Sequence, residues 1–292
     1  MEQLAACPVC ESDRTALAFE GGTIRNPDDP ARWRVERCLD CSLGFLNPQP
    51  SWDDLQAYYT ESYDAYSRSG DVEAAARDAL NSGEVRFLPI PKGKRVLDFG
   101  CGGGFFLRVC QRLGATVKGI EPSPIGAEFA RSHGLDVFHG TLEQFETDEK
   151  FDIITVNQVL EHVPDPISTL TRLKSLLAPG GTILIAVPNA ACSWAKKLGW
   201  KWDGADLPFH LLHFTPESMA RAAGRAGLKV QRIRTYSEPW IVAFSMRKHL
   251  RENWLIPGRL TAALYPAWMA RRLGASLDRK CAGDNLVVEL TA

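Results

Sequence analysis

The stretch Val96-Leu97-Asp98-Phe99-Gly100-Cys101-Gly102-Gly103-Gly104-Phe105-Phe106 joins an apolar run to a dense glycine turn. The run predicts a buried strand, and the residues after Gly104 predict that a helix begins there. Glycines at the alternate positions 100, 102 and 104 permit positive φ angles and let a ligand approach the backbone. Asp98 at the strand end favours a cationic or hydroxyl-bearing ligand over a bare phosphate.

A second strand that ends in an acid follows at a workable distance. After a helix predicted over 105–113 and a break at Gly114, the segment 116–121 predicts a buried strand ending in Glu121. A carboxylate at this point of a βαβ unit can accept hydrogen bonds from both hydroxyls of a ribose. The alternative is a solvated acid at a strand end. The two strands together predict a nucleoside site.

Strands and helices continue to alternate along the chain. Further strands are predicted at 136–139, 151–157, 182–187, 228–236 and 285–290, and further helices at 124–133, 166–177 and 216–226. Regular alternation favours a parallel sheet with helices on both faces and ligands at the carboxyl ends of its strands.

Three motifs together carry a family resemblance. The pattern D-x-G-x-G-x-G at 98–104, the pair Ile120-Glu121 and the segment 151–163, which contains Asn157-Gln158-Val159-Leu160-Glu161-His162-Val163, resemble class I S-adenosylmethionine (SAM) methyltransferases. The resemblance covers about residues 85–292. It implies an α/β, Rossmann-like fold with a seven-stranded, mostly parallel sheet whose last strand, 285–290, is antiparallel. It also implies an enzyme that moves a methyl group from SAM.

The same resemblance assigns the cofactor to this chain's strand ends. Asp98 would orient the ammonium of SAM, Glu121 would hold its ribose, and Leu142 or Glu143 would contact the adenine, since Thr141 stands where an acid is common. The cofactor-binding residues implied are Asp98, Gly100, Cys101, Gly102, Gly104, Glu121, Leu142, Glu143, Asn157 and Gln158. Tyr63 and Tyr66, within a linker over 48–91, are candidates for a lid or for ordinary helix packing.

Histidines supply the candidate catalytic base, because an imidazole titrates near working pH and can deprotonate a hydroxyl acceptor. His210 and His213 follow the fifth predicted strand, where this fold builds its acceptor pocket, and they are the preferred acid/base pair. His162, in the Glu-His-Val turn, lies close to the cofactor and is a third candidate. The alternative for each is an imidazole held within a loop.

Eight cysteines include two C-x-x-C pairs, Cys7 with Cys10 and Cys38 with Cys41. Two such pairs have the spacing of knuckles that bind one tetrahedral zinc ion, so residues 1–47 are predicted to form a zinc ribbon too small to fold without metal. Reduced or redox-active thiols are the alternative.

Composition excludes some classes of protein. The chain has 34 Lys and Arg against 35 Asp and Glu, so no overall basic field attracts nucleic acid. The N-terminal residues show no export signal, and no apolar run is long enough to span a bilayer. We therefore expect a cytoplasmic protein of 292 residues, with a SAM-binding domain over 92–292.

Residues 240–280 predict an amphipathic helical insertion that mixes aromatic and basic side chains. It can roof the active site, form a homodimer face or contact a membrane surface. The most favoured function is methyl transfer to a small molecule, above all a hydroxyl of a sugar or secondary metabolite. The alternatives are an RNA methyltransferase that reads its substrate with the ribbon, and a non-catalytic SAM-fold partner module.

Overall fold

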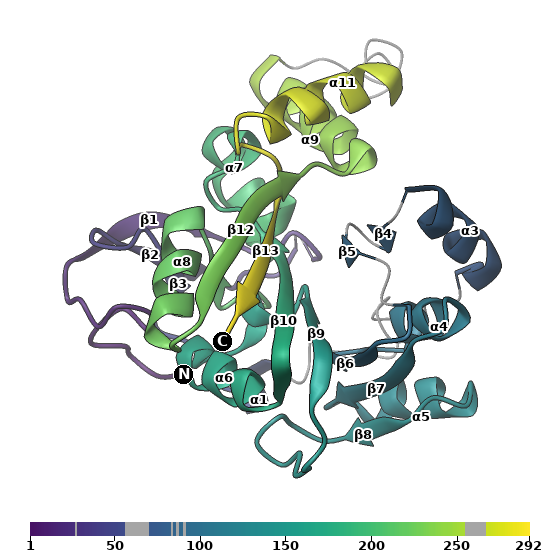
Figure 1. Cartoon of the computed structure of the whole chain (residues 1–292). Coiled ribbons are helices and arrows are strands. Elements are labelled where there is room, and N and C mark those ends of the chain that lie inside the picture. The colour runs from purple at the N-terminus through teal and green to yellow at the C-terminus, as the bar shows by residue number, and fades with distance from the viewer. Residues whose placement is uncertain (27, 56–69, 83, 86–87, 90–91, 255–266) are drawn as a thin grey trace.

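The computed structural model describes residues 1–292 except 27, 56–69, 83, 86–87, 90–91 and 255–266. Its centre is a seven-stranded sheet in the order β12-β13-β10-β9-β6-β7-β8 (Figure 1). The strands are β6 (Arg95–Phe99), β7 (Thr116–Glu121), β8 (Val137–His139), β9 (Phe151–Asn157), β10 (Leu177–Pro188), β12 (Lys229–Tyr236) and β13 (Asn285–Thr291). Strands β6 to β10 are parallel, whereas β13 runs antiparallel to both β10 and β12. The predicted Rossmann-like fold is confirmed.

Helices cover the sheet, and their first residues explain where they begin. They are α3 (Val72–Ser82), α4 (Phe105–Arg112), α5 (Pro124–Ser132), α6 (Pro166–Ser175) and α8 (Pro216–Arg225). The side chains of Ser123, Asp165 and Thr215 accept hydrogen bonds from the first turns of α5, α6 and α8. Each of these caps precedes a proline, whose fixed φ suits the first helical position.

The start of one predicted strand, 182–187, differs from the structure, and the predicted linker over 48–91 contains short elements. Strand β10 begins at Leu177, because Leu177 already pairs with Phe151 before the register shifts at 178–181. Within the predicted linker over 48–91, α3 ends at Ser82, and β4 (Glu84–Val85) and β5 (Leu88–Pro89) follow as a short antiparallel pair. The same linker also contains α1 (Trp52–Leu55), and the candidate lid residues Tyr63 and Tyr66 lie outside the described residues.

The N-terminal module is built into the rest of the molecule. Its strands β1 (Thr15–Gly21), β2 (Trp33–Cys38) and β3 (Gly44–Leu46) form a sheet that is completed by β11 (Leu212–His213). Strand β11 comes from the segment after β10 and pairs antiparallel with β3. Apolar residues of the module, such as Val35 and Phe45, share one buried core with Leu97 and Ile154 of the central sheet.

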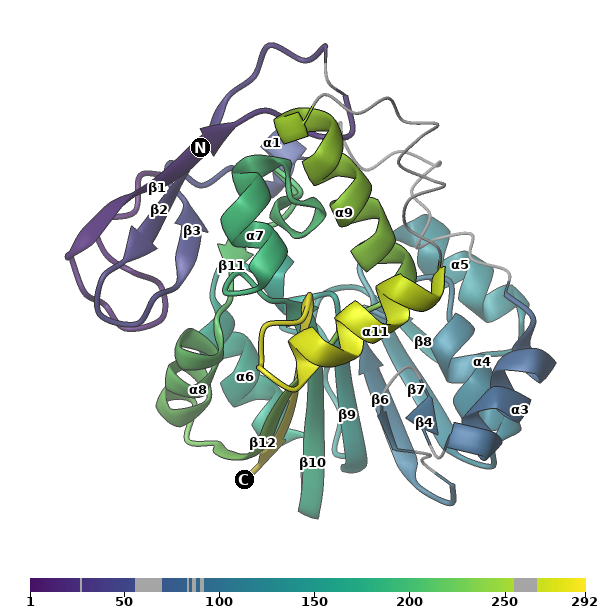
Figure 2. The same cartoon turned by 90° about the horizontal axis from the view of Figure 1, so that it is seen from above.

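A helical lobe, defined as residues 192–205, 239–254 and 267–280, stands beyond the carboxyl end of β10 (Figures 1 and 2). It contains α7 (Ser193–Leu198), two 3₁₀ turns, Gly199–Lys201 and Asp203–Ala205, α9 (Pro239–Trp254) and α11 (Ala267–Asp278). A separate apolar cluster, which includes Trp194, Trp202, Val242 and Met246, holds these helices together. Of the predicted helical insertion over 240–280, the described residues form α9 and α11. Among the described residues, none of the helices combines the length and apolar character that crossing a bilayer requires.

Candidate active site and metal centre

The glycine turn after β6 has the backbone shape that its sequence predicts. Gly100, Gly102 and Gly104 all have positive φ, at 74°, 53° and 75°. A Cβ on Gly100 would lie 2.4 Å from Val159 Cγ2, and one on Gly104 would lie 2.3 Å from Leu135 Cδ1. Any larger residue at 100 or 104 would therefore collide with its neighbours as well as strain the backbone. Two backbone N–H groups, of Gly100 and Cys101, donate to Ile120 O at 2.8 and 3.1 Å and tie the turn to β7.

Glu121 fastens this turn to the next one. One carboxylate oxygen accepts from Gly102 N at 2.7 Å and the other from Ser123 N at 2.8 Å. Burial raises the pKa of Glu121, and the two backbone donors oppose that rise. Each carboxylate oxygen has a second lone pair, so the same group can still accept a hydrogen bond from a ligand. Glu121 thus lies at the end of β7 beside the glycine turn, where a bound ribose is expected.

Asp98 lies buried at the end of β6. Thr155 Oγ1, on the neighbouring strand β9, donates to Asp98 Oδ1 at 2.6 Å. This bond fixes the orientation of the carboxylate, which is 4% exposed. Asp98 and Glu121 therefore lie at the carboxyl ends of adjacent parallel strands and place two acidic groups at the same end of the sheet.

The next strand end, after β9, brings two amide side chains to the same edge. Both polar atoms of the Asn157 side chain are buried and have no partner among the described residues. Buried amide groups are normally hydrogen-bonded, so a missing partner is expected where a ligand or water supplies it. Gln158 has a positive φ of 57°, and its Nε2 donates to Asn285 Oδ1 at 3.1 Å.

The two residues predicted to contact the adenine differ in burial. The Leu142 side chain is completely buried within the main core, whereas the Glu143 side chain is exposed. Both follow β8, whose carboxyl end adjoins that of β7. Cys101 is buried in the turn, and burial raises its pKa, so it stays a neutral thiol at pH 7.

The 3₁₀ turn Leu160–His162 begins where Val159 abuts the glycine turn, and it carries two polar side chains inward. The rings of His162 and His210 lie edge to face with centroids 4.8 Å apart. His210 Nε2 lies 3.9 Å from Glu161 Oε1 and 3.8 Å from Asp206 Oδ2. The structure therefore brings together His162 and His210, two of the three predicted base candidates.

The hydrogen bonds of these rings fix their tautomers. His162 Nδ1 lies 2.8 Å from Phe209 O, and His210 Nδ1 lies 2.9 Å from Gly204 O. Because a carbonyl oxygen only accepts, both Nδ1 atoms donate, and the lone pair of each neutral ring is on Nε2. Burial lowers the pKa of His162 to about 3 and also lowers that of His210. Both rings are thus neutral at pH 7, the state that a general base requires.

Two buried carboxyl groups flank the pair. Glu161 is 1% exposed, and neither carboxyl oxygen has a hydrogen-bond partner among the described residues. Burial raises the pKa of Glu161 to about 8. Asp206 is instead paired with Arg25, whose Nε donates to Oδ1 at 2.9 Å and whose Nη2 donates to Oδ2. Despite burial, the Arg25 guanidinium holds the pKa of Asp206 below its usual value.

His213 has a different setting. It lies on β11 opposite Gly44 of β3, and its ring packs edge-on against Phe19 with centroids 5.9 Å apart. Burial lowers its pKa to about 3, and its Nε2 has no partner among the described residues. His213 therefore belongs to the junction between the N-terminal module and the acceptor segment.

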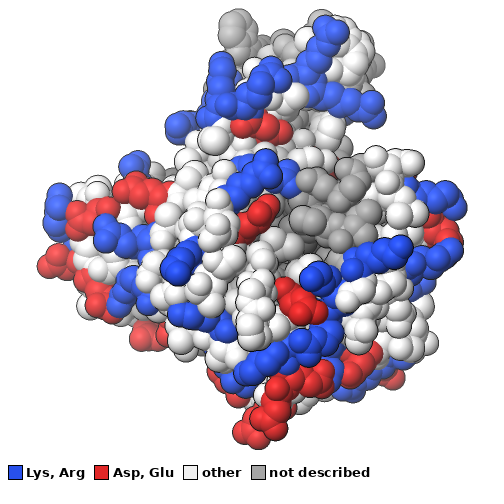
Figure 3. All heavy atoms as spheres, in the orientation of Figure 1, with Lys and Arg blue, Asp and Glu red and all other residues white. Residues whose placement is uncertain are grey.

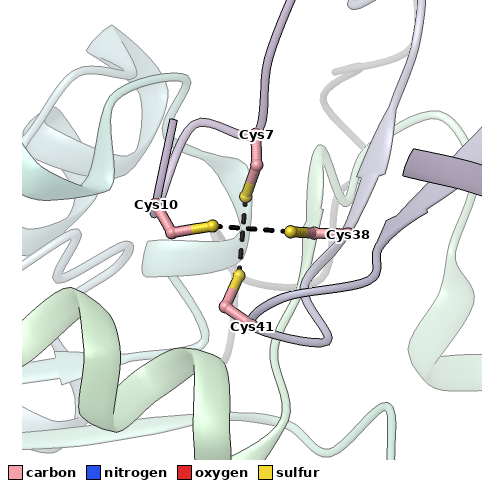
Figure 4. Close-up of side chains that lie close together, drawn as sticks. All are labelled: Cys7, Cys10, Cys38 and Cys41. Carbon is pink, nitrogen blue, oxygen red and sulfur yellow. Dashed lines mark hydrogen bonds between the residues drawn. The ribbon is translucent and has the colours of Figure 1, made fainter. Parts of the chain in front are cut away.

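The four predicted metal ligands converge at one point. The sulfur atoms of Cys7, Cys10, Cys38 and Cys41 point toward one another (Figure 4) and all lie within 4.8 Å of one another. Cys7 Sγ is 3.5 Å from Cys41 Sγ, and Cys10 Sγ is 3.4 Å from Cys38 Sγ. These separations exclude disulfides. A tetrahedral zinc ion with Zn–S bonds of about 2.3 Å needs sulfurs about 3.8 Å apart, so the donor set fits zinc.

Glu161, His162 and His210 form a second group whose donor atoms lie within 4.8 Å of one another. Its neutral imidazoles and buried carboxyl suit acid–base chemistry, and the same atoms are also possible metal ligands. A metal analysis separates the two uses, because the Cys group and this group would together bind two ions.

Several residues of the site were not predicted. Arg25, Glu161 and Asp206 have no sequence signal that places them together beside His210. Asp284, immediately before β13, was also missed: it is 3% exposed, and neither carboxyl oxygen has a partner among the described residues. A buried acid next to a predicted strand carries no periodic signal.

Comparison with known proteins decides the family. A profile described as a methyltransferase domain matches residues 73–233, more than half of the chain. The chain belongs to this family of SAM-dependent methyltransferases. The match begins after the four-cysteine module and therefore concerns only the domain built on the central sheet.

Named relatives agree with this membership. The methyltransferase is 40% identical over 199 residues to the ubiquinone biosynthesis O-methyltransferase of Pasteurella multocida, a match covering 58% of this chain and 79% of that protein. It is 41% identical over 109 residues to the protein of the same name from Actinobacillus pleuropneumoniae serotype 5b, covering 33% of this chain and 47% of that one. The chain thus spans about half the length of the second relative.

A solved structure shares the fold. A SAM-dependent methyltransferase from Archaeoglobus fulgidus superimposes with a TM-score of 0.50 at 18% identity, covering 78% of this chain and 97% of that one. At this identity the likeness concerns the fold alone.

Proposed function

We propose that this methyltransferase moves the methyl group of SAM to a hydroxyl of a small-molecule acceptor, and that His162 and His210 supply the base. The observation that carries the proposal is that the glycine turn and the proposed base are connected by a few residues of chain. Val159 packs on Gly100 of the glycine turn, and the next residues lead directly into the turn that carries His162. His162 is therefore three residues along the chain from Val159 at the wall of the proposed cofactor site, and His210 lies beside it with ring centroids 4.8 Å apart.

The chemistry needs few groups. The acceptor oxygen attacks the methyl carbon in line, the S–CH₃ bond breaks as the O–CH₃ bond forms, and the hydroxyl proton goes to an imidazole Nε2. SAM supplies an electrophilic methyl, and the products are the methyl ether and S-adenosylhomocysteine. The negative charge of Asp206 favours protonated forms of both His162 and His210, so it stabilises the imidazolium as it forms.

The cofactor is assigned to the strand ends described above. Asp98 would hold the ammonium of SAM, Glu121 its ribose hydroxyls, and the Gly100–Gly104 turn its methionine portion. Leu142 and Glu143 are retained for the adenine, and Asn157 and Gln158 for the side of the sulfonium. The buried, unpartnered amide of Asn157 supports a ligand at this place.

Zinc is proposed for Cys7, Cys10, Cys38 and Cys41. Its role here would be structural, since four thiolates leave no open coordination position. The module contributes to the site through β3, which pairs with β11 next to the segment of His210, and through Arg25, which holds Asp206. The ion would therefore help to position the proposed base.

The acceptor class is proposed from chemistry. A neutral imidazole pair suits an oxygen acceptor that must lose a proton, and the relatives named above are O-methyltransferases. A sugar or another hydroxylated metabolite fits this description. The balanced charge of the whole chain argues against RNA as the substrate.

The test measures S-adenosylhomocysteine release from purified protein with three acceptor panels: sugars and nucleotide sugars, phenols, and total RNA. Turnover confined to a hydroxyl-bearing small molecule, with a methyl ether in the product, is expected. Turnover only with RNA would replace this function by RNA methylation. Tight SAM binding with no turnover of any panel or of a cell metabolite extract would favour the non-catalytic partner module.

A further inference from the structure

The helical lobe has a charge composition unlike that of the rest of the chain. It contains ten Lys and Arg against three Asp and Glu, whereas the whole chain has 34 against 35. Figure 3 shows Lys and Arg spread over the part of the molecule that projects beyond the central sheet. The lobe is therefore a basic projection on a protein whose remainder is acidic.

Large aromatic side chains are exposed on the same lobe. Trp240 is 67% exposed, Phe244 48% and Trp268 57%. Trp240 and Phe244 are four residues apart on α9, so they share one face of the helix. Exposed tryptophans are uncommon on monomeric surfaces and indicate an interaction site when they cluster.

Two of these aromatic residues are matched with a cation one helical turn later. Lys248 Nζ lies 5.6 Å from the Phe244 ring centre, and Arg272 Cζ lies 5.5 Å from that of Trp268. Interfacial helices combine aromatic rings, which enter the headgroup layer, with basic side chains attracted to anionic lipids.

Several of the basic side chains are available to a partner. Lys196, Lys197, Arg271 and Arg272 are exposed and form no ion pair with any described residue. Lys201 is paired with Glu252, and Lys248 with Asp203. The available charges thus come from both α7 and α11, on either side of α9 in the sequence.

We propose that the helical lobe docks on an anionic lipid surface, with Trp240, Phe244 and Trp268 entering the headgroup layer. The basic charge of the lobe is complementary to an anionic lipid surface. A symmetric dimer formed lobe to lobe would bring two basic surfaces together, which like-charge repulsion opposes. Single-stranded nucleic acid is bound in basic grooves lined by stacking rings, whereas this lobe is a projection that suits an extended surface (Figures 1 and 3). The docking is independent of the proposed reaction.

The experiment is vesicle co-sedimentation of the full chain without SAM or acceptor. Vesicles of phosphatidylcholine alone are compared with vesicles holding 30% phosphatidylglycerol, at about 0.1 M salt. We expect at least ~10-fold stronger binding to the anionic vesicles, since each basic residue near such a surface strengthens binding about fivefold. A blue shift of tryptophan fluorescence should accompany binding.

Matched double variants test whether the helical lobe is the surface that binds the vesicles. Arg271→Glu with Arg272→Glu should weaken vesicle binding ~10-fold or more, while Lys229→Glu with Arg232→Glu, an equal charge change on exposed residues of β12, should have little effect. Trp240→Ser with Trp268→Ser should abolish the fluorescence shift and weaken binding, unlike Leu17→Ser with Leu80→Ser. Each variant is first checked for an unchanged melting temperature.

Three results would overturn the proposal. These are equal affinity for neutral and anionic vesicles, equal losses in the lobe and control variants, and a lipid-free dimer that the tryptophan substitutions dissociate. RNA binding tighter than vesicle binding, and lost in the lobe variants, would reassign the surface to nucleic acid. None of these outcomes bears on methyl transfer, which is measured with soluble acceptors.

Discussion

Arg25 of the N-terminal module donates from Nε to Asp206 Oδ1 at 2.9 Å, although 181 positions separate them in the sequence. This ion pair ties the module to the segment that carries His210, whose Nε2 lies 3.8 Å from the same Asp206 carboxylate. One arginine outside the SAM-binding domain thus sets the charge beside the proposed base.

Replacing this arginine should destabilise the protein. Arg25→Met leaves Asp206 buried without its cation, and we expect a loss of about 1–3 kcal/mol in the free energy of unfolding, less than for a fully buried pair because Arg25 is 40% exposed. Urea unfolding measures the loss. Arg112→Ala, which breaks an exposed and solvent-screened pair with Glu73, should leave the free energy of unfolding nearly unchanged. Equal effects would show that the Asp206 pair has no special structural role.

Zinc removal should unfold the N-terminal module. Purified protein is expected to hold one zinc ion per chain by elemental analysis, and Cys10→Ser or Cys41→Ser should lose it and melt at lower temperature. Cys281→Ser, at an exposed cysteine outside the group, serves as the control. Wild-type protein without zinc would contradict the assignment, and two ions per chain would place the second at Glu161, His162 and His210.

Cofactor affinity should depend on the two buried strand-end acids. Asp98→Asn and Glu121→Gln each remove a charged acceptor, and we expect SAM to bind about 10- to 100-fold more weakly by calorimetry. Asp152→Asn is the matched control, because Asp152 lies near the amino end of β9, where it accepts from Arg95 N at 2.8 Å. Unchanged affinity in both test variants would refute the cofactor assignment.

The proposed base should control turnover without controlling SAM binding. His162→Ala and His210→Ala should each lower kcat by about 10²- to 10⁴-fold, while the Kd for SAM stays within threefold. Because burial lowers the pKa of both imidazoles, the acid limb of the pH–rate profile should lie below the ordinary imidazole pKa. His213→Ala tests the third predicted base, and His133→Ala, at an exposed helix end, is the control. Full activity in the His162, His210 and His213 variants would make all three structural.

Asp284 should make stability depend on pH. Burial raises the pKa of Asp284 to about 7, so the folded state favours the neutral acid. The contribution of Asp284 to the free energy of unfolding is therefore fully present below pH 4 and is lost as the pH rises to 7. Asp284→Asn removes that decline. At pH 8 the variant should be more stable than wild type by up to about 4 kcal/mol, and near pH 4 the two should be equal. Asp148→Asn, at an exposed acid, should not change with pH relative to wild type. A stability difference between Asp284→Asn and wild type that is the same at pH 4 and pH 8 would refute the expectation.

Much of the fold could be predicted from local pattern. Three features are local: the glycine turn at 100–104, the strand ends at Asp98 and Glu121, and the helices that begin with a polar cap and a proline. They are local because φ preference, apolar periodicity and capping act over a few residues. The antiparallel last strand came from the family resemblance. The start of β10 was missed because its first pairing, Leu177 with Phe151, precedes an irregular turn.

The composition of the active site was only partly predictable. The sequence named His162 and His210 separately, but nothing local indicates that their rings lie 4.8 Å apart. Strand β11 has two residues, too few for any periodic signal, yet it joins the N-terminal sheet to the acceptor segment.

By itself the sequence determined the alternating strands and helices of the central sheet, the glycine turn and the candidate four-cysteine metal site, since these depend on residue type and spacing along the chain. Only the tertiary structure decided that Arg25 faces Asp206, that Glu161 is buried beside His210 and that exposed aromatic residues gather on a basic lobe. Burial, charge pairing and exposure are properties of the packed molecule, because they depend on distances between residues far apart in the chain.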